Sequence, residues 1–332
     1  MKLHHRILGE GEPLFILHGL FGSSDNWQTL GKDFAENFQV IFVDQRNHGR
    51  SPWSDEFNYD LMVADFHELV MDLGFSKINI LGHSMGGKTA IGFAAKYPEL
   101  IDKMIVADIS HKQYPMHHDQ IIEGLKSLEL SKNKSRGQAD RELANHIHEV
   151  VVRQFLLKKL YWIEKGQLGW RINIPVLADR IYDIIDEIKF DQINTNTLFI
   201  RGGKSNYILE SDYTELSLKF PNSKILFMAP TKPLCNQHMK TFLKHVNGVD
   251  EENFTLITGM IKPENRKELY KKKFIFATPQ TVTNDVINRT LNLEDFSLVV
   301  FDEAHRAVGD YDYVFLATQY KKQAKNCKIL GM

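Results

Sequence analysis

Short apolar runs that end at turn residues recur along this chain, and each is followed by a segment whose apolar residues have helical spacing. Such runs predict buried β-strands. Strands that alternate with helices are typical of βαβ units, in which helices cover a parallel sheet. The runs that predict strands in the N-terminal part are Leu14–Leu17, Gln39–Val43, Ile78–Leu81, Met104–Ala107 and Thr197–Ile200.

The pattern changes between His111 and Lys189. Strand-like runs become few and helical periodicity dominates, as over Asp140–Tyr161. We therefore expect a helical insertion that forms a lid over the carboxyl edge of the sheet. The polar segment Ser131–Ser135 is expected to be a mobile link within this lid.

From Lys224 the alternation of strands and helices resumes. The pattern predicts strands at Ile225–Met228, Phe254–Ile257, Phe274–Ala277 and Leu298–Phe301. It predicts helices between them at Leu234–Val246, Pro263–Lys271 and Gln280–Arg289. The predicted fold class is therefore α/β throughout, with parallel strands in both parts of the chain.

Composition narrows the class of protein. The 332 residues are enough for two domains, and the formal net charge of −1 gives no overall field that would favour nucleic acid or a membrane. Two distant cysteines, Cys235 and Cys327, argue against a disulfide framework. With no signal peptide and no apolar run of membrane-spanning length, a cytoplasmic protein is expected. The basic stretch Lys262–Lys273 favours a solvated helix face over a phosphate contact.

Residues Gly82–Gly86 (GHSMG) have the pattern of a nucleophile elbow, a sharp turn between a strand and a helix that exposes a serine hydroxyl. Ser84 is the predicted nucleophile. The upstream turn His18–Gly22 can offer a backbone N–H to an oxyanion, so Leu20 and Met85 are the predicted oxyanion donors.

Several longer segments share this context, and with them the chain resembles the α/β-hydrolase superfamily, in particular small esterases of the YbfF type. The resemblance covers about residues 1–227. It implies an α/β-hydrolase sheet with a helical lid at about residues 111–190, no metal, and cleavage of small acyl esters through an acyl-serine. The segments that carry it are His18–Asn26 (HGLFGSSDN), Asp44–Ser51 (DQRNHGRS), Gly82–Lys88 (GHSMGGK), Asp108-Ile109 and Trp170–Leu177 (WRINIPVL).

The resemblance places the catalytic acid at Asp108, because the alternative acid position holds Ser205. A strand-end cap is the other interpretation of Asp108. The family histidine is expected near position 233, where this chain has Ala229–Leu234 (APTKPL). His238 is the nearest histidine, and we weigh it either as a replacement base or as a solvated helix residue. His83 is expected to pack within the elbow. Loss of the base predicts impaired activity.

Four segments occur in order in the C-terminal part: Ala229–Leu234, Thr258-Gly259, Ala277–Gln280 (ATPQ) and Asp302–Ala307 (DEAHRA). With them this part resembles superfamily-2 DEAH helicases of the archaeal Hef and FANCM type over about residues 224–332. The resemblance implies a partial RecA-like parallel sheet. It also implies that Asp302 holds Mg²⁺, that Glu303 polarises water, and that Thr231 and Lys232 touch a nucleic-acid backbone. Ordinary strand-end carboxylates are the alternative.

The helicase resemblance lacks its phosphate loop, because the esterase-like region occupies that place, and it stops before the next motif. We therefore expect a truncated helicase fragment. Gly82–Thr89 does fit the phosphate-loop pattern G-x-x-x-x-G-K-[ST]. A nucleophile elbow, however, is too tight to wrap an anion with successive N–H groups. No phosphate site is expected there.

We predict domains at 1–227 and 228–332, with the join in Lys224–Met228, an apolar run that suits either sheet. The hypothesis for this arrangement is a fusion or chimera. The expected function is serine ester hydrolysis without a cofactor. The alternatives are a remnant of a nucleic-acid-dependent ATPase, which alone would need Mg-ATP, and a non-catalytic chimera.

Overall fold

The computed structural model describes most of the chain as two compact units, Met1–Phe190 and Asp191–Met332. The domain boundary expected at 227–228 stays a prediction. The described residues are 1–116, 118–130, 135–200, 205–209, 212–221, 225–228, 230–245, 251–296, 298–302, 311–323 and 329–331.

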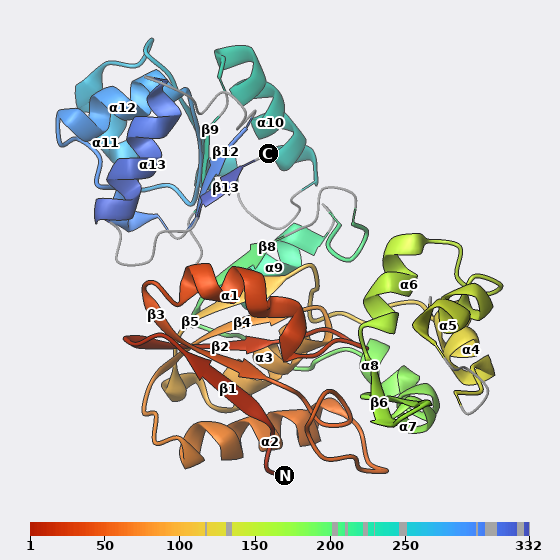
Figure 1. The fold of residues 1–332 in the computed structure, drawn as a ribbon. Helices are drawn as coiled ribbons and strands as arrows, with labels where there is room; N and C mark the ends of the chain where they lie inside the picture. The colour runs from red at the N-terminus through yellow and green to blue at the C-terminus, as the bar shows by residue number, and fades with distance from the viewer. Residues whose placement is uncertain are drawn as a thin grey trace. The chain divides into compact units, whose positions relative to one another are not determined.

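The first sheet has six strands in the order β1-β3-β2-β4-β5-β8 (Figure 1). Strand β2 pairs in parallel with β3 and β4, and β4 pairs in parallel with β5. Strand β1 pairs antiparallel with β3, so the sheet is mixed but mostly parallel. All five predicted N-terminal strands are confirmed, and β1 is an addition. The strands are β1 His5–Leu8, β2 Glu12–Leu17, β3 Phe38–Val43, β4 Ile78–His83, β5 Ile101–Ala107 and β8 Asn196–Ile200.

Alternate residues of β2 point to opposite faces of this sheet, as strand geometry requires. On one face Leu14 and Ile16 join a buried cluster with Phe34 of helix α1 (Gln28–Phe34). On the other face the Phe15 ring packs edge-on against Phe66 of helix α2 (Tyr59–Asp72), with 5.3 Å between centroids. Helix α3 (Met85–Lys96) packs beside α2. Helices therefore cover both faces, and the carboxyl ends of β2, β4 and β5 carry the loops of interest.

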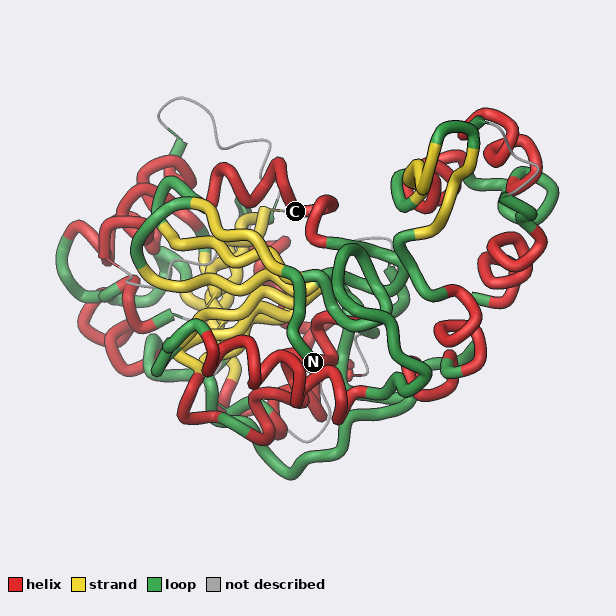
Figure 2. The backbone as a smooth tube through the Cα atoms, turned by 60° about the horizontal axis from the view of Figure 1, so that its bottom comes forward, coloured by secondary structure: helices red, strands yellow, loops and turns green. Residues whose placement is uncertain are grey.

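The lid consists of short helices and a β-hairpin. The single helical stretch expected over Asp140–Tyr161 is wrong, because α5 ends at Leu143, α6 starts at Val150, and β6 and β7 form an antiparallel pair. Figure 2 shows this yellow hairpin among the red helices of the lid. Residues 131–134, within the expected mobile link, lie outside the described ranges. The lid elements are α4 Asp119–Ser127, α5 Arg136–Leu143, α6 Val150–Leu157, β6 Leu160–Glu164, β7 Gln167–Trp170, α7 Ile174–Asp179 and α8 Ile181–Ile185.

The second sheet has five parallel strands in the order β10-β11-β9-β12-β13. Strand β9 (Ile225–Met228) pairs with both β11 and β12, so the run that suited either sheet is a strand of this one. The four predicted C-terminal strands are confirmed. The other strands are β10 Phe254–Ile257, β11 Phe274–Ala277, β12 Leu298–Phe301 and β13 Ile329–Gly331.

Helices flank the second sheet, and the three predicted ones are confirmed within a few residues at their ends. Helix α10 packs on β10 and β11, and Cys235 of this helix is buried with Phe276 and Val300. A second cluster joins Met228 and Val299 to Tyr313 of α13. The helices of this unit are α9 Tyr213–Lys219, α10 Lys232–His245, α11 Pro263–Leu269, α12 Pro279–Ile287 and α13 Asp312–Gln323, and its short 3-10 turns are Glu251–Asn253 and Leu293–Asp295. The first unit has 3-10 turns at Ser24–Trp27 and Pro98–Leu100.

Candidate active site

Ser84 sits in a strained turn between β4 and α3, with φ 50° and ψ −121°. Non-glycine residues rarely adopt this conformation, and it is the one that a nucleophile elbow imposes on its serine. The Ser84 N–H donates to the carbonyl of Ala107 on the neighbouring strand at 3.0 Å. A Cβ atom on Gly82 would overlap the carbonyl of Gly86, and one on Gly86 would overlap the carbonyl of Leu17. The small residues of the motif are therefore required by close backbone approach.

The turn His18–Gly22 lies directly beside the elbow. A Cβ atom placed on Gly19 would be 3.2 Å from the Cβ of Ser84. The turn is closed by a hydrogen bond from the Gly22 N–H to the Gly19 carbonyl at 2.9 Å. The structure thus brings the segment that contains Leu20 next to Ser84, and Met85 is the first residue of α3. Assignment of their N–H groups as oxyanion donors stays a prediction.

Two buried histidines, His18 and His48, form hydrogen bonds that hold this turn in place. The Nε2 atom of His48 accepts the Phe21 N–H at 3.2 Å, which fixes Phe21 at φ 57°. The Nε2 atom of His18 accepts the Gln45 N–H at 3.0 Å. Burial lowers the pKa of His18 to about 4 and that of His48 to about 3, so both rings are neutral acceptors at neutral pH.

Asp108 follows the strand next to the nucleophile strand. In the β4–β5 register His83 pairs with Ala107, so Ser84 and Asp108 leave adjacent strand ends. Asp108 has φ 55°, a positive value that it shares with Phe21 and Ser84. Burial lowers the pKa of His83, and the carboxylate of Asp108 opposes that shift, which places the two side chains close in electrostatic terms. The position fits an acid that orients a base, although its catalytic role stays a prediction.

The other histidines have defined surroundings. His238 lies in α10 of the second unit, where its Nε2 is 3.0 Å from Oδ2 of Asp302. In His18 and His48 the Nδ1 atoms contact the carbonyls of Gly19 and Arg46, at 2.8 Å in each case, so both nitrogens of each ring are engaged. His83 packs its ring against Trp27, as expected for an elbow residue. His238 as replacement base stays a prediction.

An apolar wall faces the elbow from the lid. Met85 is buried in one cluster with Ile122 and Leu125 of α4 and Leu177 of α7, and Leu20 packs against the same cluster. Burial of these side chains makes the surroundings of the two predicted oxyanion residues apolar. Such surroundings suit an acyl chain better than a charged substrate.

The lid is attached to the core through two of the segments that carried the resemblance. The N–H of Asn173 donates to the carbonyl of Asn47 at 3.0 Å, and their side-chain amides are joined by a 3.1 Å hydrogen bond. Ile172 forms a β-bridge with His48. The lid segment around WRINIP therefore rests on the DQRNHG loop, which also supports the Phe21 turn.

The phosphate-loop pattern at Gly82–Thr89 has packing roles. Lys88 is 1% exposed, its Nζ donates to the carbonyls of Ile185 and Asp186, and it lies 4.9 Å from the centroid of the Tyr114 ring. Thr89 donates to Oε1 of Gln45 at 2.9 Å. Both side chains are turned into the protein interior. That this turn is not a phosphate site stays a prediction.

The helicase-like residues are only partly described. Thr231 and Lys232 are exposed at the start of α10, and the Thr231 hydroxyl accepts the Leu234 N–H at 3.4 Å. Oδ2 of Asp302 is already hydrogen-bonded to His238, and Glu303 lies outside the described residues. In the part of the chain that the structure describes, no three carboxylate, histidine or cysteine side chains converge as metal ligands. That Asp302 holds Mg²⁺ stays a prediction.

One residue of the basic stretch is not solvated. Arg266 is 6% exposed, and its guanidinium donates to Oδ1 of Asp285 at 2.8 Å, while the Tyr270 hydroxyl donates to Oδ2 of the same carboxylate at 2.7 Å. The expected solvated face therefore holds for its exposed lysines but is wrong for Arg266, because a buried carboxylate on the adjacent helix requires a partner.

The sequence did not indicate that Lys88 and Lys159 are buried. Lys159 of the lid donates to Ser23 and Asn26, next to the oxyanion turn. The presence of a lysine in the sequence does not indicate these hydrogen-bond partners, because they come from segments far apart in the chain. The segment His18–Asn26 (HGLFGSSDN) contains both acceptors, Ser23 and Asn26, but nothing in it indicates that a cation binds there.

Comparison with known proteins agrees with this geometry. Residues 12–229 match the family model described as alpha/beta hydrolase fold, and the chain belongs to this family. Esterase YbfF of Escherichia coli is 35% identical over 213 residues, which cover 64% of this chain and 82% of that protein. The solved structure of a marine microorganism esterase superposes with a TM-score of 0.65 at 41% identity, covering 66% of this chain and 88% of its own.

The C-terminal segment has a different set of relatives. Residues 202–332 match the model described as Type III restriction enzyme, res subunit. A putative ATP-dependent RNA helicase of Methanocaldococcus jannaschii is 44% identical over 112 residues, which are 33% of this chain but only 14% of that protein. The helicase-like resemblance and the RecA-like class of the second sheet are thus confirmed, for a small part of a helicase.

Within the residues that the structure describes, no helix is both long and apolar enough to cross a membrane. The expected cytoplasmic location stays a prediction.

Proposed function

We propose that this chain is a serine carboxylesterase that acts on small acyl esters, with activity lowered by loss of the family base. The single observation that supports it best is the strained Ser84 turn directly beside the Gly19 turn, so close that a Cβ added to Gly19 would lie 3.2 Å from the Cβ of Ser84. The similarity to esterases over the same residues agrees with this.

In the proposed mechanism the Ser84 hydroxyl oxygen attacks the ester carbonyl carbon. The carbonyl oxygen becomes an oxyanion, which the N–H groups of Leu20 and Met85 stabilise by hydrogen bonding. Collapse expels the alcohol and leaves an acyl-serine, and water then attacks the acyl carbon to release the acid. Asp108 would orient the base that removes the serine proton.

The proposed site lacks a general base at the position where the resemblance expects one. The chain that follows β9, where the resemblance expects the histidine, belongs to α10 and packs on strands of the second sheet. Pro233 stands in this helix. Without a base the serine hydroxyl is a poor nucleophile, and removal of one triad member lowers turnover by roughly four to six orders of magnitude. We propose that turnover is correspondingly low.

The test is hydrolysis of a short p-nitrophenyl ester by the full chain and by Ser84→Ala. A matched control is Ser54→Ala, a surface-loop serine that lies outside the elbow. Turnover that disappears in Ser84→Ala and persists in Ser54→Ala supports the proposal. Equal turnover in all three proteins contradicts it.

A second candidate is contact with a nucleic-acid backbone through Thr231 and Lys232, supported by their exposure at the first turn of α10. Helix N-termini bind phosphate oxygens well. The candidate predicts weak binding of single-stranded DNA that falls steeply with salt. Lys232→Ala should weaken it, whereas Lys271→Ala, an exposed lysine on the same unit, should leave it unchanged.

A further inference from the structure

Lys159 is a buried cation that joins the lid to the core. It stands between α6 and β6, its side chain is 2% exposed, and its Nζ donates to Oγ of Ser23 and to Oδ1 of Asn26, at 2.7 Å each. Its backbone is fixed as well, since its N–H donates to Leu156 and its carbonyl accepts the Arg171 N–H. Lys159 therefore enters the core from a defined place in the lid.

The two acceptors belong to the segment that directly continues the oxyanion turn. Oδ1 of Asn26 also accepts the Ser23 N–H at 2.9 Å, and the Ser24 N–H donates to Oδ1 of Asp44 at 2.7 Å. The exit of the turn is thus held by Asp44 from the core and by Lys159 from the lid. The turn itself is also held by the hydrogen bond from the Phe21 N–H to His48.

A buried ammonium group is expensive to maintain when its hydrogen-bond partners are neutral oxygens. Burial lowers the pKa of Lys159 to about 8, with Asp25 and Asp44 opposing the shift and Lys158 adding to it. The aromatic ring of Phe155 lies 5.5 Å from Nζ. A side chain that served packing alone would need no charge here, so the charge calls for a role in holding the Ser23–Asn26 segment.

We propose that Lys159 is a positioning residue that sets the geometry of the oxyanion turn according to the state of the lid. When the lid is seated, its ammonium group orders Ser23 and Asn26 and through them the segment that carries Leu20. When the lid lifts, both hydrogen bonds break and the turn loses an anchor. The inference rests on the proposed hydrolase function, since it concerns the same site.

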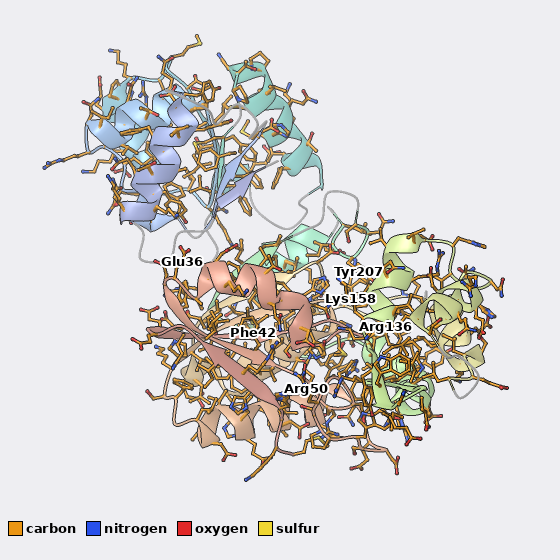
Figure 3. The ribbon with its side chains drawn as sticks, in the orientation of Figure 1. Glu36, Phe42, Arg50, Arg136, Lys158 and Tyr207 are labelled. Carbon is orange, nitrogen blue, oxygen red and sulfur yellow. The ribbon has the colours of Figure 1, made fainter. Side chains whose placement is uncertain are left out.

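The test compares amide hydrogen exchange in the full chain with that in Lys159→Met, which keeps an unbranched side chain but removes the donors. The neighbouring Lys158→Met is the matched control, because Lys158 is exposed. Figure 3 labels Lys158. We expect exchange over Gly19–Trp27 to become about tenfold faster in Lys159→Met, the effect of losing roughly one charged hydrogen bond, with no change in Lys158→Met.

A second variant approaches the same contact from the core. Ser23→Ala should speed exchange in the same segment, and combining it with Lys159→Met should add less than the sum of the two effects, because both remove one interaction. Ser23→Ala alone decides the matter if Lys159→Met fails to fold. Unchanged exchange over Gly19–Trp27, or additive effects, would overturn the proposal.

Exchange does not depend on turnover, so the two proposals fail separately. An inactive wild-type chain with the predicted exchange pattern would contradict the esterase proposal alone. If turnover is present, Lys159→Met should lower kcat at nearly constant KM, because a displaced oxyanion donor affects the transition state more than the bound ester. A loss confined to KM would count against a positioning role.

Discussion

The ring of His238 is hydrogen-bonded to the carboxylate of Asp302, with 3.0 Å between Nε2 and Oδ2. Both residues come from the helicase-like part of the chain. The histidine nearest to the expected base position is therefore held by an acid of the second sheet, and the acid expected to hold Mg²⁺ is held by a histidine. This one hydrogen bond therefore involves both the replacement base considered for the hydrolase part and the Mg²⁺ ligand expected for the helicase-like part.

His238→Ala should change Ser84-dependent ester turnover by less than about twofold, because the ring is engaged with Asp302. The measurement is the initial rate of p-nitrophenyl ester hydrolysis, with His146→Ala of the lid as a control. A loss of roughly tenfold or more would make His238 the replacement base, since general-base catalysis contributes about two to four orders of magnitude.

Gly86→Ala should destabilise the first unit by about 2 kcal/mol, because the added methyl group would overlap the backbone carbonyl of Leu17. All four tryptophans lie in this unit, so urea unfolding followed by tryptophan fluorescence reports on it directly. The matched control is Gly137→Ala in α5, where a Cβ meets no atom closer than 4.0 Å.

Gly137→Ala should stabilise the unit slightly, by about 0.5–1 kcal/mol, since alanine is the better helix former. If the two variants unfold at the same urea concentration, the close approach of the elbow to Leu17 is not as described.

Stability of the first unit should rise between about pH 8 and pH 9.5. Burial lowers the pKa of Lys88 from 10.5 to about 8, so in this window the folded state has lost a proton that the unfolded state still binds. The free energy of unfolding therefore increases with pH, by at most about 1.4 kcal/mol per pH unit for one lysine. Lys88→Met should reduce this slope without abolishing it, because burial also lowers the pKa of Lys159 in the same unit to about 8.

The comparison stops at pH 9.5 because burial raises the pKa of Tyr59 well above its ordinary value, and this shift acts in the opposite direction at higher pH. Lys96→Met, an exposed position on the same helix, is the control. Equal slopes in wild type and Lys88→Met would contradict the assignment of Lys88 as a buried cation.

The strands and the elbow could be predicted because they depend on local pattern. An apolar run fixes a strand wherever it lies, and GHSMG encodes its own turn through glycines that tolerate close backbone approach. Asp108 was predicted from the family resemblance, and the β4–β5 register places it at the strand end beside Ser84. Strand β1 was missed because its residues are half-buried or exposed at the sheet edge and give no apolar run.

Features that depend on distant partners could not be predicted. The lid hairpin was missed because its apolar residues also fit helical spacing. Strand β9 suited two sheets, and only its pairing with β11 and β12 assigns it to the second. The partners of Lys88, Lys159 and His238 all lie far along the chain, so no local pattern indicates them.

The most direct test of the central claim is the rate of p-nitrophenyl ester hydrolysis by the purified full chain beside Ser84→Ala. The account predicts a slow rate that depends on Ser84, because the elbow is formed. If the family base is missing as proposed, this rate lies roughly four to six orders of magnitude below that of an intact triad. Equal rates in the two proteins would contradict it and leave a hydrolase fold without serine chemistry.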